Sequence, residues 1–159
     1  MIAPDHRILQ WLARVHGSAR EANTEWRTQG VAMLPMGDRL CAIKLRGELV
    51  HAACNTDDPA QVATILAERL DGAVIGDDRV GATYYPLINN HAGLVWDLDN
   101  DAPCLGDGVY LGVPDLHRVA PPGAHWVVRP RYEGDLCRPQ FVRDLVAAGT
   151  QRLRPAGCS

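Results

Sequence analysis

The chain has 159 residues, of which 47% are hydrophobic and 22% are charged, and its formal net charge is -3. This length and composition are typical of one globular domain with a sizeable core, and they exclude an intrinsically disordered chain. The negative net charge disfavours a dedicated nucleic-acid binder, whose domain is ordinarily basic, but it leaves room for a local basic patch.

The first residues contain no apolar segment like that of a signal peptide, and no later run approaches the roughly 18 apolar residues of a membrane span. We therefore expect no membrane partner and a cytoplasmic location. The five cysteines form no Cys-x-x-Cys pair, which in a reducing compartment predicts free thiols. They are Cys41, Cys54, Cys104, Cys137 and Cys158.

Residues 6–28 carry apolar side chains at helical spacing and predict a long amphipathic helix. Gly17 and Ser18 can interrupt it and leave two shorter helices, and Gly30 is suited to end it. We expect this segment to pack on a sheet; a coiled-coil seam that pairs two copies of the chain is the alternative. The apolar face consists of Ile8, Leu12, Val15, Ala19, Ala22 and Trp26.

Residues 31–36 and 39–45 predict two strands, because both segments are rich in apolar side chains. The linker Gly37-Asp38 is a weak hairpin signal that would pair these strands with each other. Residues 49–54 fit either a short strand or a helical turn.

A second helix is predicted over residues 59–70 from the residues that begin it. Asp58 can accept hydrogen bonds from the first turn, Pro59 suits the first helical position, and Gln61 completes a capping box. Gly72 is expected to end this helix.

Short strands are predicted next at residues 73–75 and 82–88. Pro86 cannot donate a backbone hydrogen bond, so the second of these is expected at a sheet edge or on a bulge. Residues 94–96 are expected to continue the sheet.

Residues 104–114 hold three glycines, a short apolar run and a final proline. Gly106 and Gly108 predict a tight turn that feeds a strand ending at Pro114, and we expect that strand to be central in the sheet. Residues 125–129 predict a further strand, and a last helix begins near Pro139.

These elements predict an α/β (α+β) domain: a mixed, mainly antiparallel sheet with N-terminal, middle and C-terminal helices packed on it. We expect a single domain over residues 1–159. Within it, residues 1–29 form a helical segment, residues 30–153 the α/β core and residues 154–159 a tail.

Aspartates offer the most conspicuous candidate site. Asp97, Asp99 and Asp101 alternate along one loop, but the glycine and glutamate that a calcium-binding loop requires are missing. Asp97 and Asp99 would point to the same side of an extended chain and could hold Mg²⁺ or Mn²⁺. A solvated acidic turn is the favoured interpretation, so no metal or other cofactor is predicted and this pair is a fallback. Asp77 and Asp78 are likewise interpreted as a turn.

No complete catalytic constellation is present. His51 and Cys54 have a spacing usable for zinc, but no second pair completes four ligands. The sequence contains no nucleophile elbow, Walker loop, Rossmann fingerprint or His-Glu-x-x-His motif.

Arginines beside an aromatic ring form the candidate binding patch. Trp126 lies on a predicted strand close to Arg129 and Arg131. Such a group can bind a phosphate or the plane of a base, although a surface strand with a packed tryptophan explains the same residues.

The order of segments over residues 30–150 resembles the bacterial primase-polymerase family, within the archaeo-eukaryotic primase superfamily. Gly30-Val-Ala-Met-Leu-Pro35 is similar to the opening strand of that family, and Asn55-Thr-Asp-Asp-Pro-Ala-Gln-Val62 is similar to its Thr-Thr-Asp-Pro helix start. In this resemblance, Gly72-Ala-Val-Ile-Gly-Asp77 lies where the first catalytic carboxylate strand of the family would lie, and Gly81-Ala-Thr-Tyr-Tyr85 lies where its Gly-x-His-x-aromatic strand would lie. Leu105-Gly-Asp-Gly-Val-Tyr-Leu-Gly-Val-Pro114 is similar to its Arg-Gly-Asp-Gly-Gly-Tyr-Val strand.

The departures from this family concern its catalytic groups. The resemblance implies a metal-binding carboxylate pair, a histidine and a third acidic residue, which two-metal phosphoryl transfer requires. The histidine position is Thr83 or Tyr84 here, and Cys104 or Leu105 falls near the third acidic position. The resemblance therefore implies the fold of a degenerate, inactive relative.

From these patterns we expect a non-enzymatic binding or regulatory protein that engages a protein partner, a nucleotide or a nucleic acid. The predicted binding residues are Arg129, Arg131, Trp126, Tyr85 and Asp107. One alternative is a metal-dependent nucleotidyl transferase that uses Asp97 and Asp99. Another is a homodimeric module that associates through its N-terminal helix.

Overall fold

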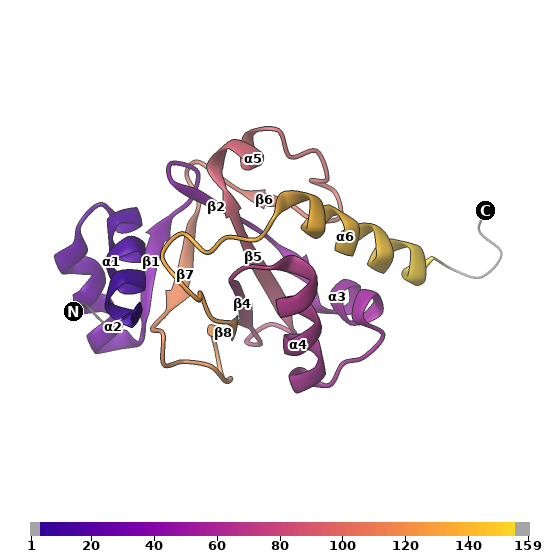
Figure 1. Ribbon diagram of the computed structural model, residues 1–159, viewed down its shortest axis with the longest axis horizontal. Helices are drawn as coiled ribbons and strands as arrows, with labels where there is room; N and C mark the ends of the chain where they lie inside the picture. The colour runs from indigo at the N-terminus through magenta and orange to yellow at the C-terminus, as the bar shows by residue number, and fades with distance from the viewer. Residues whose placement is uncertain (1–3, 155–159) are drawn as a thin grey trace.

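The computed structural model of the chain describes residues 4–154 (Figure 1). Its helices are α1 (Pro4–His16), α2 (Ala19–Gln29), α3 (Gly47–Cys54), α4 (Pro59–Leu70), α5 (Asn90–Leu94) and α6 (Pro139–Leu153). Its strands are β1 (Val31–Pro35), β2 (Leu40–Ile43), β3 (Leu45–Arg46), β4 (Val74–Asp77), β5 (Thr83–Asn89), β6 (Cys104–Leu105), β7 (Tyr110–Pro114) and β8 (His125–Val128). The predicted class, a mixed α/β fold with mainly antiparallel sheets, is confirmed.

The strands form two separate sheets. The larger has the order β6-β2-β5-β4-β8, with β3 also paired to β5, and the smaller is a ribbon of β1 and β7. Every paired strand is antiparallel, and Ile75 on β4 lies opposite Tyr85 on β5.

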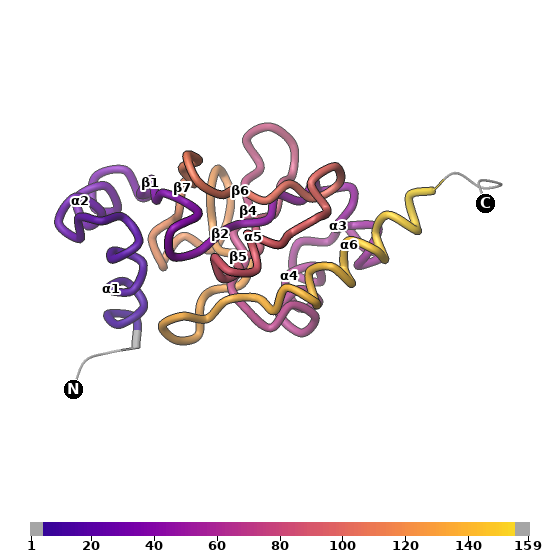
Figure 2. The backbone as a smooth tube through the Cα atoms, turned by 90° about the horizontal axis from the view of Figure 1, so that it is seen from above, coloured from indigo at the N-terminus to yellow at the C-terminus, as the bar shows by residue number. Residues whose placement is uncertain are grey.

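The larger sheet is covered on both faces, so its strands bury consecutive residues. On one face it packs against the ribbon with α1 and α2, and on the other against α3, α4 and α6 (Figures 1 and 2). On β2, Ala42 packs in the first of these two clusters, whereas Cys41 and Ile43 pack in the second. All four residues of β2 are buried.

The N-terminal segment is two helices, which is the interrupted form of the predicted helix. Gly17 has a φ of +90°, which favours glycine, and the side chain of Ser18 caps α2 by accepting a hydrogen bond from the amide of Glu21. Both helices pack on one another and on β1. Gly30 ends α2 as predicted, with a φ of +75°.

The predicted hairpin of residues 31–36 and 39–45 is wrong. β1 pairs with β7 and β2 pairs with β5 and β6, so the turn at Gly37 passes the chain from one sheet to the other. Gly37 has a φ of +103°, and its amide donates to the carbonyl of Leu40.

The ambiguous segment 49–54 is helical and belongs to α3, which buries Leu49 and Val50 against α6. The prediction for α4 is confirmed over residues 59–70, including the cap at Asp58 and the early proline. The last capping residue is Asp71 in the left-handed conformation, one position before the expected glycine.

Two details of the predicted sheet are corrected. Pro86 is not at an edge, because β5 is bordered by β4 on one side and by β2 and β3 on the other. Pro86 lies between the residues that pair with β2 and those that pair with β3, so its missing N–H falls at this break. Residues 94–96 do not continue the sheet, because Leu94 ends α5 and the chain then turns and buries Trp96.

The stretch 104–114 divides between the two sheets. β6 adds to the edge of the larger sheet, the chain turns at Gly108 with a φ of +87°, and β7 joins the ribbon. The expected strand therefore exists, but it is not central.

Among residues 4–154, no helix has the length and apolar character needed to cross a lipid bilayer. Cys41, Cys54, Cys104 and Cys137 are free thiols, as predicted. Cys158 and most of the predicted tail lie outside the described residues.

Candidate functional site

A cleft of about 310 Å³ opens between the ribbon and the larger sheet. We name it the inter-sheet cleft. Tyr85 and Asp77 reach it from the larger sheet, Lys44 from the joint between β2 and β3, and Tyr110 from the ribbon. Arg79 completes its polar lining from the loop after β4.

The ribbon shapes one wall of this cleft. Gly112 lies opposite Met33 in the β1–β7 pairing. Because glycine has no side chain, the surface of the ribbon is recessed at this position. Tyr110 begins β7 and is 61% exposed, so much of its ring is accessible to a ligand. The stretch 104–114 therefore forms a rim of the cleft.

On the larger sheet, which forms the opposite wall of the cleft, Asp77 at the end of β4 forms an ion pair with Arg79. Arg79 donates from Nε and Nη2 to both carboxylate oxygens of Asp77, with Nη2–Oδ2 at 2.6 Å. These hydrogen bonds from Arg79 lower the pKa of Asp77 and keep it ionised. The pair leaves the outer part of the guanidinium exposed to solvent.

Lys44 and Tyr85 provide a cation and an aromatic ring on the larger sheet. Lys44 is exposed, and no ion pair joins it to any residue between 4 and 154. Burial, and secondly the nearby charge of Asp77, raises the pKa of Tyr85, so the phenol is neutral at pH 7. The cleft thus combines two tyrosine side chains with the cation of Lys44 and with the ion pair of Arg79 and Asp77.

The predicted arginines have partners within the chain. Arg131 donates to both oxygens of Asp135, at 2.9 Å each, and to Asp71 at 3.0 Å. Asp135 is 1% exposed and also accepts from the amide of Arg131, so this group fastens a loop. Arg129 forms an ion pair with Asp5 at 3.2 Å. Neither arginine lines the inter-sheet cleft.

Two further predicted residues lie outside the cleft. Trp126 is 1% exposed and its indole nitrogen donates to the carbonyl of Pro114, so the expectation of a ring free to bind a ligand is corrected to a core residue. Asp107 lies in the turn before β7 and packs on Gly37, where an added Cβ would come within 2.5 Å of its backbone nitrogen. Of the five predicted binding residues, only Tyr85 lines the inter-sheet cleft.

The fallback metal pair is separated from this cleft. Asp97 forms an ion pair with Arg143 on α6, and that hydrogen bond lowers the pKa of Asp97. Asp99 lies on the same loop and is exposed. Among the described residues, no three side chains of the metal-ligating types are grouped to hold an ion.

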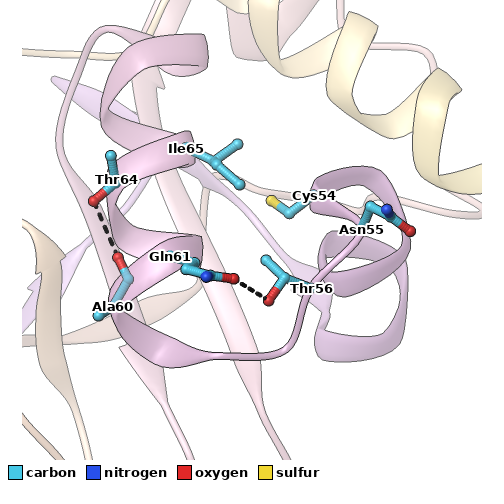
Figure 3. A pocket seen from close by; sticks show the side chains of 7 residues that line it. All are labelled: Cys54, Asn55, Thr56, Ala60, Gln61, Thr64 and Ile65. Carbon is cyan, nitrogen blue, oxygen red and sulfur yellow. Dashed lines mark hydrogen bonds between the residues drawn. The ribbon is translucent and has the colours of Figure 1, made fainter.

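His51 and Cys54 also face different surroundings. Cys54 lines an open hollow between α3 and α4, where Thr56 donates to Gln61 at 2.7 Å (Figure 3). His51 lies instead within 2.8 Å of the Tyr84 hydroxyl, in a separate cavity. The two side chains do not form a shared site.

Sequence reasoning missed Lys44, Arg79 and Tyr110 as members of one site. They come from three segments between residues 44 and 110, and no local pattern predicts that the ribbon folds over the larger sheet. Lys44 is the only lysine of the chain, which is a signal, but it reflects genomic composition as readily as function.

Comparisons of the chain with models of known protein families, with curated proteins and with solved structures gave no match.

Proposed function

We propose that this chain is a non-catalytic binding domain on a primase-polymerase-like scaffold, and that its inter-sheet cleft binds a nucleotide or single-stranded nucleic acid. The observation that carries the proposal is the meeting of Tyr85 and Tyr110 with Lys44 and Arg79 in one cleft. Aromatic rings stack on bases, and lysine and arginine pair with phosphates. The exposed ring of Tyr110 offers the stacking surface, and Lys44 the phosphate contact.

The family resemblance supports the same cleft. Four of the five segments that carry it, residues 30–35, 72–77, 81–85 and 105–114, contribute lining residues. Asp77, Tyr85 and Tyr110 are the polar ones among them. The likeness thus concerns one connected surface rather than scattered motifs.

The absence of catalysis in this proposal rests on two features of the site. Thr83 or Tyr84 stands where the resemblance implies a histidine, and Asp77 is bound at both oxygens by Arg79. A carboxylate engaged in this way would have to release its arginine before it could hold a metal ion. Binding without turnover suits a regulatory role.

Fluorescence anisotropy with labelled oligo(dT) and calorimetry with ATP test the proposal and distinguish the two ligands. Tyr110→Ala should weaken binding by about 1–3 kcal/mol, the range for one base–aromatic stack. Lys44→Gln should weaken it and lower the salt dependence by about one charge. Tyr132→Ala and Arg20→Gln, which alter exposed residues outside the cleft, are the matched controls.

Saturable binding that Tyr110→Ala and Lys44→Gln reduce, but the controls do not, supports the proposal. Binding that none of the four variants alters would place the ligand elsewhere and contradict it. Failure of both ATP and oligo(dT) to bind at low salt would also overturn it, since electrostatic contacts are strongest there.

A further inference from the structure

A second cavity, of about 470 Å³, lies among α4, the ends of β4 and β5, strand β8 and the loop 119–121. We name it the α4 cavity. Its volume lies within the range of small-molecule sites. Asp77, at the end of β4, borders both this cavity and the inter-sheet cleft. None of the other residues that line the α4 cavity borders the inter-sheet cleft.

The floor of the α4 cavity presents an imidazole. Gly76 lies opposite His125 in the β4–β8 pairing, and a Cβ on Gly76 would come within 3.1 Å of the Nε2 atom of His125. His125 Nδ1 donates to the carbonyl of Gly123 at 2.9 Å, because a carbonyl can only accept. In the neutral form of the ring Nε2 is therefore an acceptor, and no hydrogen bond from residues 4–154 occupies it.

Hydrogen bonds hold the walls in place. The Oδ1 atom of Asp78 accepts from the amide of Gly123 at 2.8 Å, so both polar backbone groups of Gly123 are held by residues that line the cavity. Across the cavity, the rings of His51 and Tyr84 pack edge to face with centroids 5.6 Å apart. The site is thus built from fixed groups.

The charges of the lining favour a positively charged ligand. It contains the carboxylates of Asp57, Asp77 and Asp78 and no lysine or arginine. Arg79 offsets the charge of Asp77 only, and it lies outside this lining. Apolar groups face these acids from α4 and the loop, among them Pro59, Ala63 and Pro121.

We propose that the α4 cavity binds a small organic cation, an amine or amidine carried on a compact apolar or aromatic body. The carboxylates of Asp57 and Asp78 and the free Nε2 atom of His125 accept hydrogen bonds from its N–H groups, and Pro59, Ala63 and Pro121 cover its body. This site does not depend on nucleotide binding in the inter-sheet cleft, and it disfavours phosphates.

The test uses benzamidine and its uncharged analogue benzamide as probes of the full chain, followed by ¹H–¹⁵N NMR. Benzamidine should shift the amides of Gly76, Tyr84 and His125 in a saturable manner. Benzamide should bind at least about tenfold more weakly, since it lacks the charge that the carboxylates attract.

Variants locate the site. Ala63→Leu should fill the cavity and reduce benzamidine affinity at least about tenfold, whereas Ala67→Leu, an exposed position one turn later on α4, should not. Asp57 is exposed, and its side chain makes no hydrogen bond among the described residues. Asp57→Asn removes its charge and should weaken benzamidine binding several-fold without unfolding the chain.

Three results would overturn the proposal: no saturable shift with benzamidine at millimolar concentration, equal affinity for benzamide, or affinity unchanged by both Ala63→Leu and Asp57→Asn. ATP and oligo(dT) binding in the Ala63→Leu variant separates this proposal from the previous one, because that variant leaves the inter-sheet cleft intact.

Discussion

Cys137 lies at a crowded crossing of the chain, where the segment before α6 passes beside β4 and β5. Its amide donates to the carbonyl of Leu87 at 2.7 Å, and its Sγ atom lies 3.3 Å from the carbonyl of Ala73. A Cβ on Gly72 would come within 2.6 Å of the Cα atom of Cys137, so only glycine fits there. Burial at this crossing raises the pKa of Cys137 to about 12.

The raised pKa predicts that the free energy of unfolding falls as the pH rises from about 8.5 towards 12. In this window the unfolded thiol loses its proton and the folded thiol keeps it, so the unfolded state gains in stability. Below it both states hold the proton, and the thiol contributes no pH dependence. One such thiol contributes a slope of at most about 1.4 kcal/mol per pH unit.

Urea unfolding over pH values from about 8 to about 10.5 measures this slope. The Cys137→Ala variant should show a shallower decline than the parent chain, whatever its stability at pH 8. Equal slopes in the two proteins would show that the thiol is not held protonated by the fold.

At the scale of elements, α3 and α6 are in close contact at Gly149. A Cβ on Gly149 would lie 2.9 Å from the Cγ atom of Leu49 and closer still to the carbonyl oxygen of Leu49. Glycine in the middle of α6 costs about 1 kcal/mol of helix propensity relative to alanine. The close packing of the two helices offsets that cost.

Gly149→Ala should therefore destabilise the chain, although helix propensity alone predicts stabilisation by about 1 kcal/mol. Overpacking of a tight contact costs about 1–3 kcal/mol, which exceeds the gain in propensity. Chemical denaturation measures whether the free energy of unfolding falls or rises. Ala147→Gly, at an exposed position on the same helix, calibrates the propensity, and a rise in stability for Gly149→Ala would refute the proposed close contact.

The elements that could be predicted from the sequence are those with local signals. The start of α4 follows from Asp58 and Pro59, because a cap and an early proline act within one turn. The pairing of β1 with β7 joins residues about 80 positions apart, and Gly37-Asp38 shows only that the chain turns, not which strand it meets.

The same limit explains the candidate site. Tyr85 was predicted because it belongs to a segment that resembles a known family, whereas Lys44 and Arg79 show no pattern of their own. Arg131 was predicted as a ligand-binding residue, but Asp71, 60 positions earlier, is brought beside it by the fold. A residue type indicates its chemistry, and only the tertiary fold determines which partner it meets.

At the scale of the whole molecule, two tryptophan side chains fix the ribbon to its neighbours. The indole nitrogen of Trp26 on α2 donates to the carbonyl of Val113, and that of Trp126 on β8 donates to the carbonyl of Pro114, both at 3.0 Å. Both acceptors lie at the end of β7. The ribbon is thus fixed to α2 and to the larger sheet, which sets the width of the inter-sheet cleft.

This connection predicts that both layers unfold in one transition. The larger sheet contributes buried residues to both hydrophobic clusters, such as Ile75 to one and Val74 to the other, so neither cluster persists when the sheet is lost. Trp26 belongs to the first cluster and Trp96 to the second. Incorporation of 5-fluorotryptophan places a ¹⁹F label in each.

Urea titration followed by ¹⁹F NMR should give coincident midpoints for the Trp26 and Trp96 resonances. Trp126→Phe keeps an aromatic ring but loses the hydrogen bond to β7. It should lower the free energy of unfolding by roughly 1–2 kcal/mol and shift both urea midpoints down together. If the Trp26 resonance changed at a lower urea concentration than that of Trp96, the ribbon with α1 and α2 would be an independent unit. The inter-sheet cleft would then be the contact between two units, and its width would vary with their separation rather than being fixed by the fold.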